Sequence, residues 1–231
     1  MRPFSLGRRL ALCASMVRDG AAFADVGTDH AYLPVFLAMR GRVRSAVASD
    51  VRPGPLRAAE KNVLRYGVSE LVSVRLSDGL DGILPREADD VAVAGMGGEL
   101  IAKIVGKAGW LKDPGKRLIL QPMTSAPELR LFLAKEGFAI LREEAVSEDG
   151  RVYTAILSAY DPGGVRTDEL YPYAGGLDGS TEDGRLYLRR QALRLRKQAR
   201  GMALTGKEGE AGALERIAAK LSVLGGKEES R

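Results

Sequence analysis

The sequence has few of the residues that hold metal ions or form covalent bridges. Its 231 residues include one cysteine, Cys13, and one histidine, His30. One cysteine excludes an internal disulfide, and these two residues alone make no zinc site, so we predict no bound metal. We interpret Cys13 as a small buried apolar residue rather than a nucleophile. A chain without disulfides suits a reducing compartment, and we expect a cytoplasmic protein.

Long apolar runs are also absent from the sequence. No stretch approaches the roughly 18 consecutive apolar residues of a membrane span, so we predict no membrane partner. The arginine-containing N-terminal stretch lacks a small-residue cleavage pattern, and we interpret it as an amphipathic helix rather than a signal peptide. Apolar residues make up 45% and charged residues 28% of the chain, which is typical of globular proteins. The length allows one catalytic-sized domain with an appendage.

Short apolar runs alternate with helical segments between residues 21 and 160, after a short helix marked by Leu6, Leu10, Cys13 and Val17. The predicted strands are Ala22–Val26, Ser45–Ser49, Val72–Leu76, Val91–Ala94, Leu118–Leu120, Phe138–Glu143 and Val152–Ala159. The predicted helices are Tyr32–Met39, Pro55–Tyr66, Glu99–Ala108 and Pro127–Glu136, with capping glycines at Gly41, Gly67, Gly109 and Gly137. Such alternation predicts an α/β, Rossmann-like parallel sheet with helices on both faces. The last two strands are close enough in sequence to form an antiparallel hairpin.

The C-terminal part has a different pattern, in which two narrow apolar seams repeat at helical spacing. The seams consist of Leu188, Ala192, Leu195, Ala199 and Met202, and of Leu214, Ile217, Leu221 and Leu224. Two such seams joined by a short loop predict an antiparallel helical hairpin of the coiled-coil type. We therefore divide the chain into a Rossmann-like domain over 1–160 with its N-terminal helix, a connection over 161–184 and a helical hairpin over 185–231.

Positive charge is concentrated in the hairpin. The last 51 residues hold 12 Lys and Arg against 7 Asp and Glu, whereas the preceding 180 residues are balanced at 23 of each. Such a stripe suits a polyanion, because cations that contact phosphates release condensed counterions. A solvated helix face is an equally good reading of the charges alone. The candidate RNA-binding residues are Arg189, Arg190, Arg194, Arg196, Lys197 and Arg200.

A polar turn follows the first predicted strand, where Rossmann-type folds bind nucleotides. It reads Asp25, Val26, Gly27, Thr28, Asp29, His30 and leads into the helix that begins at Tyr32. A dinucleotide fingerprint would need two more glycines for close approach of a pyrophosphate. An extra carboxylate is a poor neighbour for pyrophosphate but can pair with an ammonium group. The turn therefore favours S-adenosylmethionine over NAD, although an acidic turn could also simply cap the helix.

Three further motifs stand at the ends of the next strands. Asp50 follows the second strand about 20 residues after the glycine turn, where an acidic residue accepts from ribose hydroxyls or caps a helix. Asp78 and Gly79 follow the third strand, where they could bind the adenine amino group or form a tight turn. A run of Gly95, Met96, Gly97 and Gly98 follows the fourth, where small residues let the backbone approach a ligand. Together the four motifs predict a cofactor site.

The strings DVGTDHAYLP, SDVRPGPLRAAEKN, RLSDGL, GMGG and LILQPM, which begin at Asp25, Ser49, Arg75, Gly95 and Leu118, closely resemble the TrmK family of bacterial tRNA (adenine-22-N1)-methyltransferases. Five parallel strands closed by an antiparallel pair are also typical of class I methyltransferases. The resemblance covers roughly residues 5–160 and implies a C-terminal coiled-coil domain, S-adenosylmethionine as cofactor and tRNA as partner. The residues that it places around the cofactor are Asp25, Gly27, Thr28, Asp29, His30, Asp50, Asp78, Gly79, Gly95, Met96 and Gly97.

The residues after the fourth strand bear on the reaction. They lack the side-chain acceptor with which N6-adenine methyltransferases grip the exocyclic amine. The ring nitrogen N1 already has an in-plane lone pair, so the enzyme must chiefly position it in line with the methyl donor. The methylated adenine is cationic, and our catalytic candidates are Asp29 as its electrostatic partner, with His30 and Tyr32 as pocket walls.

Alternatives to this function remain open at the sequence level. The enzyme could methylate another RNA position, a protein or a small molecule, because the basic hairpin does not name the nucleotide. The chain could also be an RNA-binding protein that keeps the fold without turnover. The acidic residues Asp25, Asp50 and Asp78 argue against that loss. We expect a monomer, although nothing in the sequence fixes the oligomeric state.

Overall fold

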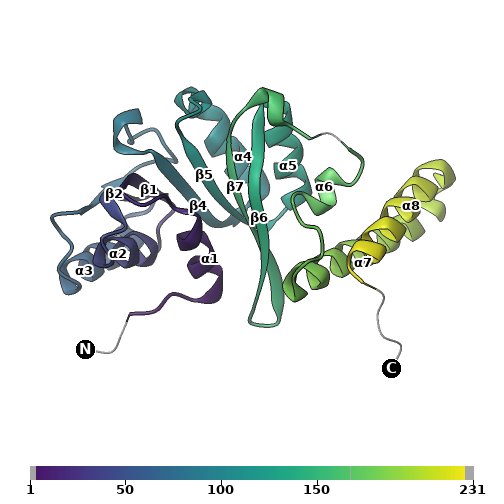
Figure 1. Ribbon diagram of the computed structural model, residues 1–231, viewed down its shortest axis with the longest axis horizontal. Helices are drawn as coiled ribbons and strands as arrows, with labels where there is room; N and C mark the ends of the chain where they lie inside the picture. Colours follow the sequence, from purple (N-terminus) through teal and green to yellow (C-terminus); the bar gives the residue numbers. More distant parts are fainter. Residues whose placement is uncertain (1–3, 167, 227–231) are drawn as a thin grey trace.

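The computed structural model describes residues 4–166 and 168–226. Residues 1–3, 167 and 227–231, which fall in the predicted Rossmann-like domain, the connection and the hairpin, lie outside the described residues. A sheet flanked by helices forms the body of the molecule, and two long helices stand at its right-hand end (Figure 1). None of the described helices is long and apolar enough to cross a membrane.

The central sheet has seven strands in the order β3-β2-β1-β4-β5-β7-β6. The strands are β1 (Ala21–Val26), β2 (Val43–Asp50), β3 (Val72–Leu76), β4 (Asp90–Gly97), β5 (Arg117–Thr124), β6 (Phe138–Glu148) and β7 (Arg151–Tyr160). The first five are parallel to one another, whereas β7 runs antiparallel to both β5 and β6. The predicted Rossmann-like fold with a closing antiparallel hairpin is confirmed. From β1 the chain adds β2 and β3 on one side of the sheet, and from β4 it adds β5 on the other side. A crevice therefore opens between the carboxyl ends of β1 and β4.

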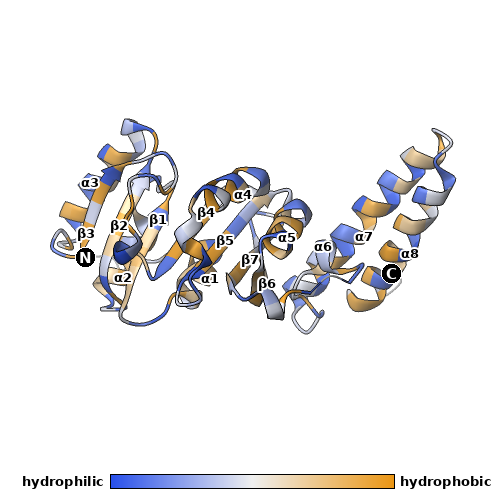
Figure 2. Ribbon diagram, turned by 90° about the horizontal axis from the view of Figure 1, so that it is seen from above, coloured by the Kyte–Doolittle hydropathy of each residue, from blue (hydrophilic) through white to orange (hydrophobic). Residues whose placement is uncertain are grey.

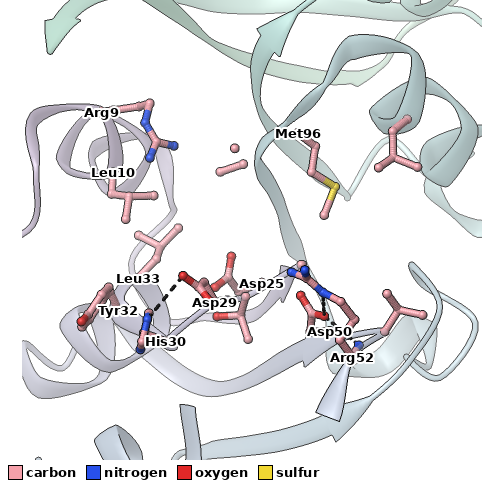
Figure 3. Close-up of a pocket in the computed structure, with 16 residues that line it drawn as sticks. Arg9, Leu10, Asp25, Asp29, His30, Tyr32, Leu33, Asp50, Arg52 and Met96 are labelled. Carbon is pink, nitrogen blue, oxygen red and sulfur yellow. Dashed lines mark hydrogen bonds and ion pairs between the residues drawn. The ribbon is translucent and has the colours of Figure 1, made fainter. Parts of the chain in front are cut away.

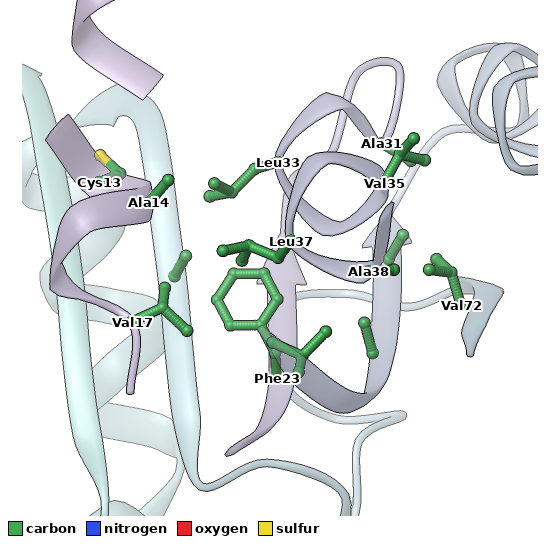
Figure 4. Packing of buried hydrophobic residues seen from close by; sticks show 14 of the residues in the cluster. Cys13, Ala14, Val17, Phe23, Ala31, Leu33, Val35, Leu37, Ala38 and Val72 are labelled. Atoms are coloured by element: carbon green, nitrogen blue, oxygen red, sulfur yellow. The ribbon is translucent and has the colours of Figure 1, made fainter. Parts of the chain in front are cut away.

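Helices cover both faces of the sheet because buried residues alternate in direction along each strand. On one face Phe23 packs among residues of α1 (Arg8–Met16), α2 (Tyr32–Met39) and α3 (Pro53–Arg65), as Figure 4 shows for the first two helices. The next residue, Ala24, faces α4 (Gly98–Lys107) and α5 (Ala126–Lys135) on the other side. Full burial of Phe23 contributes about 1.5–3 kcal/mol to this packing.

The glycines predicted to cap helices behave in two ways. Gly41, Gly67 and Gly137 have φ angles of +63°, +67° and +83°, the left-handed conformation expected after a helix. The prediction was wrong at Gly109, which begins the 3₁₀ helix η2 (Gly109–Lys112) instead. There α4 ends at Lys107, and its C-cap residue Ala108, with φ −97° and ψ 78°, leads directly into the next turn. Two other 3₁₀ turns are η1 (Pro85–Glu87) and η3 (Pro162–Gly164).

The C-terminal helices α7 (Glu182–Ala203) and α8 (Glu208–Leu224) form the predicted hairpin, and α7 is largely hydrophilic along its length (Figure 2). The first helix begins at Glu182 rather than at the predicted residue 185, because the Thr181 hydroxyl oxygen caps it by accepting from Gly184 N–H at 3.0 Å. The seam residues Leu188, Ala192, Leu195 and Leu221 are buried between the helices. Packing along the seam ends before Leu224, which is exposed.

A buried ion pair fastens the hairpin to the body. Arg130 of α5 and Glu143 of β6 are fully enclosed as side chains, with 2.6 Å between Nη2 and Oε1. Arg130 also donates to the carbonyl oxygen of Pro172 at 2.7 Å and to the hydroxyl of Tyr187 in α7 at 3.0 Å. The predicted connection is therefore not plain loop, since Pro172 lies in a short helix, α6 (Tyr171–Ala174), packed beneath α7. Breaking one side of such a pair costs about 3–5 kcal/mol.

Candidate active site

A cavity of about 540 Å³ lies at the carboxyl ends of β1, β2 and β4, under α1 (Figure 3). Its walls include nine of the predicted site residues, namely Asp25, Gly27, Thr28, Asp29, His30, Tyr32, Asp50, Gly95 and Met96. Residues that the sequence did not single out for the site complete the lining, namely Arg9, Leu10, Leu33, Val51, Arg52, Ala94 and Leu100. Segments far apart in the chain thus meet at one edge of the sheet.

The turn between β1 and α2 brings the backbone to the floor of the cavity. Gly27 has a φ of +77°, and the N–H groups of Gly27 and Thr28 both donate to the Ser49 carbonyl oxygen at 2.8 Å. A Cβ added at Gly27 would lie 1.8 Å from Cε of Met96. Only glycine combines this left-handed conformation with so close an approach.

Beyond Gly27 the turn buries the side chain of Thr28 and leaves those of Asp29 and His30 exposed at the mouth. The Thr28 hydroxyl oxygen accepts from Ala31 N–H at 3.1 Å, which holds the turn closed. Asp29 and His30 are 75% and 40% exposed as side chains and lie 3.4 Å apart between Oδ2 and Nε2. The His30 ring stacks on Tyr32 with 5.1 Å between centroids and 21° between planes. The three catalytic candidates therefore form one cluster.

Asp25 is a buried acid of the cavity, and it is 7% exposed. Burial raises the pKa of its carboxyl from 3.8 to about 6, and a hydrogen bond with the Thr28 side chain opposes that rise. The charged form is therefore costly unless a cation enters the cavity.

Asp50 occupies the neighbouring strand end, and it is 5% exposed. Its Oδ1 accepts from Arg52 N–H at 2.7 Å, and the Arg52 side chain approaches the same oxygen at 3.4 Å. These contacts hold the carboxylate just before α3, where Arg52 is the N-cap and no side chain caps the helix. Asp50 therefore lines the cavity and does not cap α3. Its second oxygen, Oδ2, makes no hydrogen bond among residues 4–166 and 168–226.

The glycine-rich run forms the end of β4 and the first residue of α4, and only part of it lines the cavity. Gly95 has a φ of +78° and donates from N–H to Oε1 of Gln121 at 3.0 Å, while Met96 projects into the cavity. Gly97 lies outside the cavity lining and caps α4 instead. Gly98 is required by packing, because a Cβ there would lie 2.2 Å from the Ser125 carbonyl oxygen.

Arg9 and Gln121 are site residues that the sequence analysis missed. The Arg9 guanidinium donates from Nη1 to Oε1 of Gln121 at 2.6 Å, the same oxygen that accepts from Gly95. Gln121 is fully buried, and its Nε2 donates to the Pro122 carbonyl oxygen at 3.0 Å. The only available signal for Arg9 was its place one helical turn before Cys13, beside the apolar stripe of α1.

Asp78 and Gly79 do not join the main cavity. They line a small depression of about 50 Å³ that shares Leu100 with it. The Asp78 side chain is 70% exposed and lies 3.8 Å from Nζ of Lys107. The strand order explains this placement, because β3 is the edge strand and lies two strands away from β1. A role for both residues in cofactor binding stays a prediction.

The hairpin cations also fall into two groups. Arg189 donates to the Gly225 carbonyl oxygen at 2.9 Å and Arg196 to the Ser222 hydroxyl at 3.0 Å, so both bind α7 to α8. The others are exposed on α7, namely Arg190, Arg194, Lys197 and Arg200. Arg190 also donates to the Gly150 carbonyl oxygen at 3.0 Å in the β6–β7 turn. The exposed group is the part available to a polyanion.

Neither the cysteine nor the acids form a further reactive centre in the part of the chain that the structure describes. Cys13 is fully buried, and burial raises the pKa of its thiol to about 12, which agrees with its interpretation as a core residue. Within residues 4–166 and 168–226, no three His, Cys, Asp or Glu side chains lie close enough to hold a metal ion.

Known proteins show the same arrangement. A family model described as a methyltransferase domain matches residues 6–156. The tRNA (adenine(22)-N(1))-methyltransferase of Bacillus subtilis (strain 168) is 38% identical over 180 residues, which are 78% of this chain and 75% of that protein. The crystal structure of the B. subtilis m1A22 tRNA methyltransferase TrmK has a TM-score of 0.85 at 27% identity, covering 95% of this chain and 100% of that chain.

A Streptococcus pneumoniae protein, Sp1610, was solved in complex with S-adenosyl-L-methionine. It has a TM-score of 0.79 at 30% identity, covering 94% of this chain and 100% of that chain. Likeness of this extent includes the hairpin as well as the sheet. The chain belongs to the TrmK family, that of the tRNA (adenine(22)-N(1))-methyltransferases.

Proposed function

We propose that this protein transfers the methyl group of S-adenosylmethionine to N1 of adenine 22 in tRNA. One observation carries the proposal: the cavity combines buried Asp25 and Asp50 with the close approach at Gly27, in a chain 38% identical to an enzyme of that name. The cavity volume of about 540 Å³ suits a small-molecule site.

The residues of the cavity fit S-adenosylmethionine better than a dinucleotide. The free Oδ2 of Asp50 can accept from a ribose hydroxyl, as acids at this strand end do in nucleotide-binding folds. Asp25 and Asp29 place negative charge near Gly27, where a methionine ammonium group would be stabilised and a pyrophosphate repelled. The likeness to Sp1610, which was solved with this cofactor, supports the same assignment.

When bound, S-adenosylmethionine supplies a methyl carbon whose bond to sulfur breaks as the adenine N1 lone pair attacks, and the electron pair leaves with sulfur. The adenine N1 carries no proton to be removed, so the chain need not provide a general base. Its residues must instead hold the base in line, and no side chain of the Gly95–Gly98 run competes for the exocyclic amine.

The cluster at the mouth would receive the adenine. The stacked His30 and Tyr32 rings form an aromatic wall on which a base taken out of its stack can lie. The product base is cationic, and the exposed carboxylate of Asp29 stands beside this wall to stabilise the developing charge. The exposed cations of α7 would hold tRNA phosphates, which position the RNA without reading its sequence. A tRNA substrate also implies a cytoplasmic location.

The test is methyl transfer from labelled S-adenosylmethionine to unmodified tRNA, with nucleoside mass spectrometry of the product. We expect 1-methyladenosine, and we expect it to disappear when adenine 22 is replaced. A methylated nucleoside at another position would favour the broader RNA methyltransferase, and binding of tRNA without turnover would favour the non-catalytic alternative. Calorimetric titration with S-adenosylhomocysteine separates loss of cofactor binding from loss of RNA binding.

A further inference from the structure

A second cavity, of about 310 Å³, lies between the body and the hairpin. The end of β5 and the start of α5, from Pro122 to Ala126, form one wall, and Tyr153 of β7 forms another. Tyr187, Gln191 and Arg194 of α7 close the third side. Of these residues only Arg194 enters the proposed function, as one of the exposed cations that would hold tRNA phosphates, so the cavity itself has no assigned role.

Gln191, which lines this cavity, has a buried polar atom without a partner among the described residues. The residue is 6% exposed, and its side-chain oxygen Oε1 is buried without a hydrogen-bond partner among the described residues. Buried polar atoms are nearly always paired, because leaving one unpaired costs free energy. An unpaired buried acceptor in a residue that lines a cavity points to a ligand that brings its own N–H or O–H donor.

The second cavity adjoins the first. Arg9 lines the first cavity, and its guanidinium lies 6.0 Å from the centre of the Tyr153 ring, which lines the second. Gln121 holds Arg9 on one side and the Pro122 carbonyl oxygen on the other. The two cavities therefore lie on either side of the contact between Arg9 and Tyr153.

The chemistry of the walls indicates what kind of ligand would bind there. The half-buried Tyr153 ring offers a stacking face, Gln191 offers a hydrogen-bond acceptor, and exposed Arg194 offers a positive charge at the mouth. An aromatic face, a base-edge acceptor and a phosphate-binding cation are the three elements of single-stranded nucleotide recognition.

We propose that this cavity binds a second nucleotide of the tRNA, adjacent to the adenine that is methylated. The amide of Gln191 accepts from the exocyclic amine or ring N–H of that base, and Arg194 contacts its phosphate. This inference rests on the proposed function, because it takes tRNA as the ligand. It adds a site that selects the substrate by a flanking base rather than by charge alone.

The test replaces Gln191 with methionine, which keeps the length of the side chain and removes the amide. We expect Gln191→Met to weaken tRNA binding about tenfold, with unchanged affinity for S-adenosylhomocysteine. The melting temperature of the free protein should stay the same or rise, because an unpaired buried acceptor is gone. Gln198→Met is the matched control, since Gln198 is an exposed glutamine of the same helix outside the cavity, and it should bind tRNA as the unchanged protein does.

A set of tRNAs with single abasic sites near adenine 22 identifies the base. We expect one abasic site to weaken binding by the unchanged protein but not by Gln191→Met, because the contact is already lost. Arg194→Gln, an exposed change that leaves the packing intact, should weaken binding severalfold for every tRNA in the set. Equal binding by Gln191→Met and the unchanged protein across the set would overturn the inference.

Failure of the proposed function is a separate result. The proposed function fails if the unchanged protein forms no 1-methyladenosine. The inference about the second cavity is tested by a different measurement, the affinity of Gln191→Met and Gln198→Met for tRNA. A loss of melting temperature in Gln191→Met, together with equal losses on all abasic tRNAs, would show a purely structural glutamine and would also overturn the inference.

Discussion

The crevice at the end of β1 and the outer face of α7 differ in what each requires of its residues. The crevice depends on individual atoms, since a single methyl group at Gly27 would lie 1.8 Å from Met96. The outer face of α7 carries long, exposed cations, of which Arg190 is held by a hydrogen bond to the Gly150 carbonyl oxygen. The crevice is therefore sensitive to a Cβ at Gly27, where φ is +77° and the end of the Met96 side chain would have to move, whereas the outer face of α7 needs only a pattern and a net charge.

The comparisons with known proteins follow the same division. The family model ends at residue 156, before the hairpin begins, yet the solved structures cover 94–95% of the chain. The domain model thus matches the part of the chain that holds the sheet, whereas the likeness to the solved structures extends over the hairpin. A seam of small and branched apolar residues is enough to specify two packed helices, whereas a cofactor crevice needs particular residues at particular φ angles.

The largest effect should come from Gly27→Ala. The change forces a left-handed conformation on a residue with a Cβ and drives a methyl group into the cavity, so we expect affinity for S-adenosylhomocysteine to fall about 100-fold. Titration calorimetry measures it. Gly41→Ala is the matched control, because Gly41 has a φ of +63° with nothing within 4 Å of an added Cβ. It should lose stability without losing cofactor affinity, and equal losses in both variants would contradict the steric account.

A smaller effect should come from replacing Arg194, Lys197 and Arg200 of α7 with glutamine. Each cation that contacts a phosphate contributes up to about 0.9 to the slope of log K against log salt, so the slope for tRNA should fall by up to about 3. Affinity at low salt should fall at least tenfold while cofactor affinity is unchanged. Filter binding over a range of salt concentrations measures both.

The control for that prediction removes the same charge from the other end of the molecule. Arg57, Lys61 and Arg65 are exposed on α3, far from the hairpin in Figure 1. If charge alone drives binding, their replacement by glutamine should weaken tRNA binding as much as the α7 variant does. If the hairpin is the docking face, the α3 variant should keep most of its affinity.

The smallest effect should be the change in cofactor affinity of the crevice with pH. Burial gives Asp25 a pKa of about 6, so lowering the pH from 7.5 to 5.5 should protonate most of it and weaken cofactor binding about fourfold. The same raised pKa favours the folded state below pH 4, and this contribution is lost as the pH rises through about 6. Asp25→Asn should bind the cofactor weakly at both pH values. Persistence of the pH dependence in that variant would assign it to another group.

The sequence predicted the elements better than it predicted the walls of the site. Tyr32–Met39 and Val72–Leu76 were predicted with their bounds because periodicity reports which residues are buried. Gln121 was visible within a motif, but its role depends on Arg9, which is 112 residues away, and local patterns carry no such information. Asp78 was predicted to line the crevice from its place after a strand, yet its distance from the crevice depends on strand order, which sequence spacing does not measure.

The buried pair of Arg130 and Glu143 changes how contacts at the hairpin act on the distant cavity. Because the pair joins α5 and β6 to α6 and α7, the hairpin is held as a rigid arm rather than tethered by a free linker. A tRNA gripped by a rigid arm has lost much of its translational and rotational freedom before its adenine reaches the mouth. Contact with phosphates far from the reaction therefore raises the effective concentration of one base at one place.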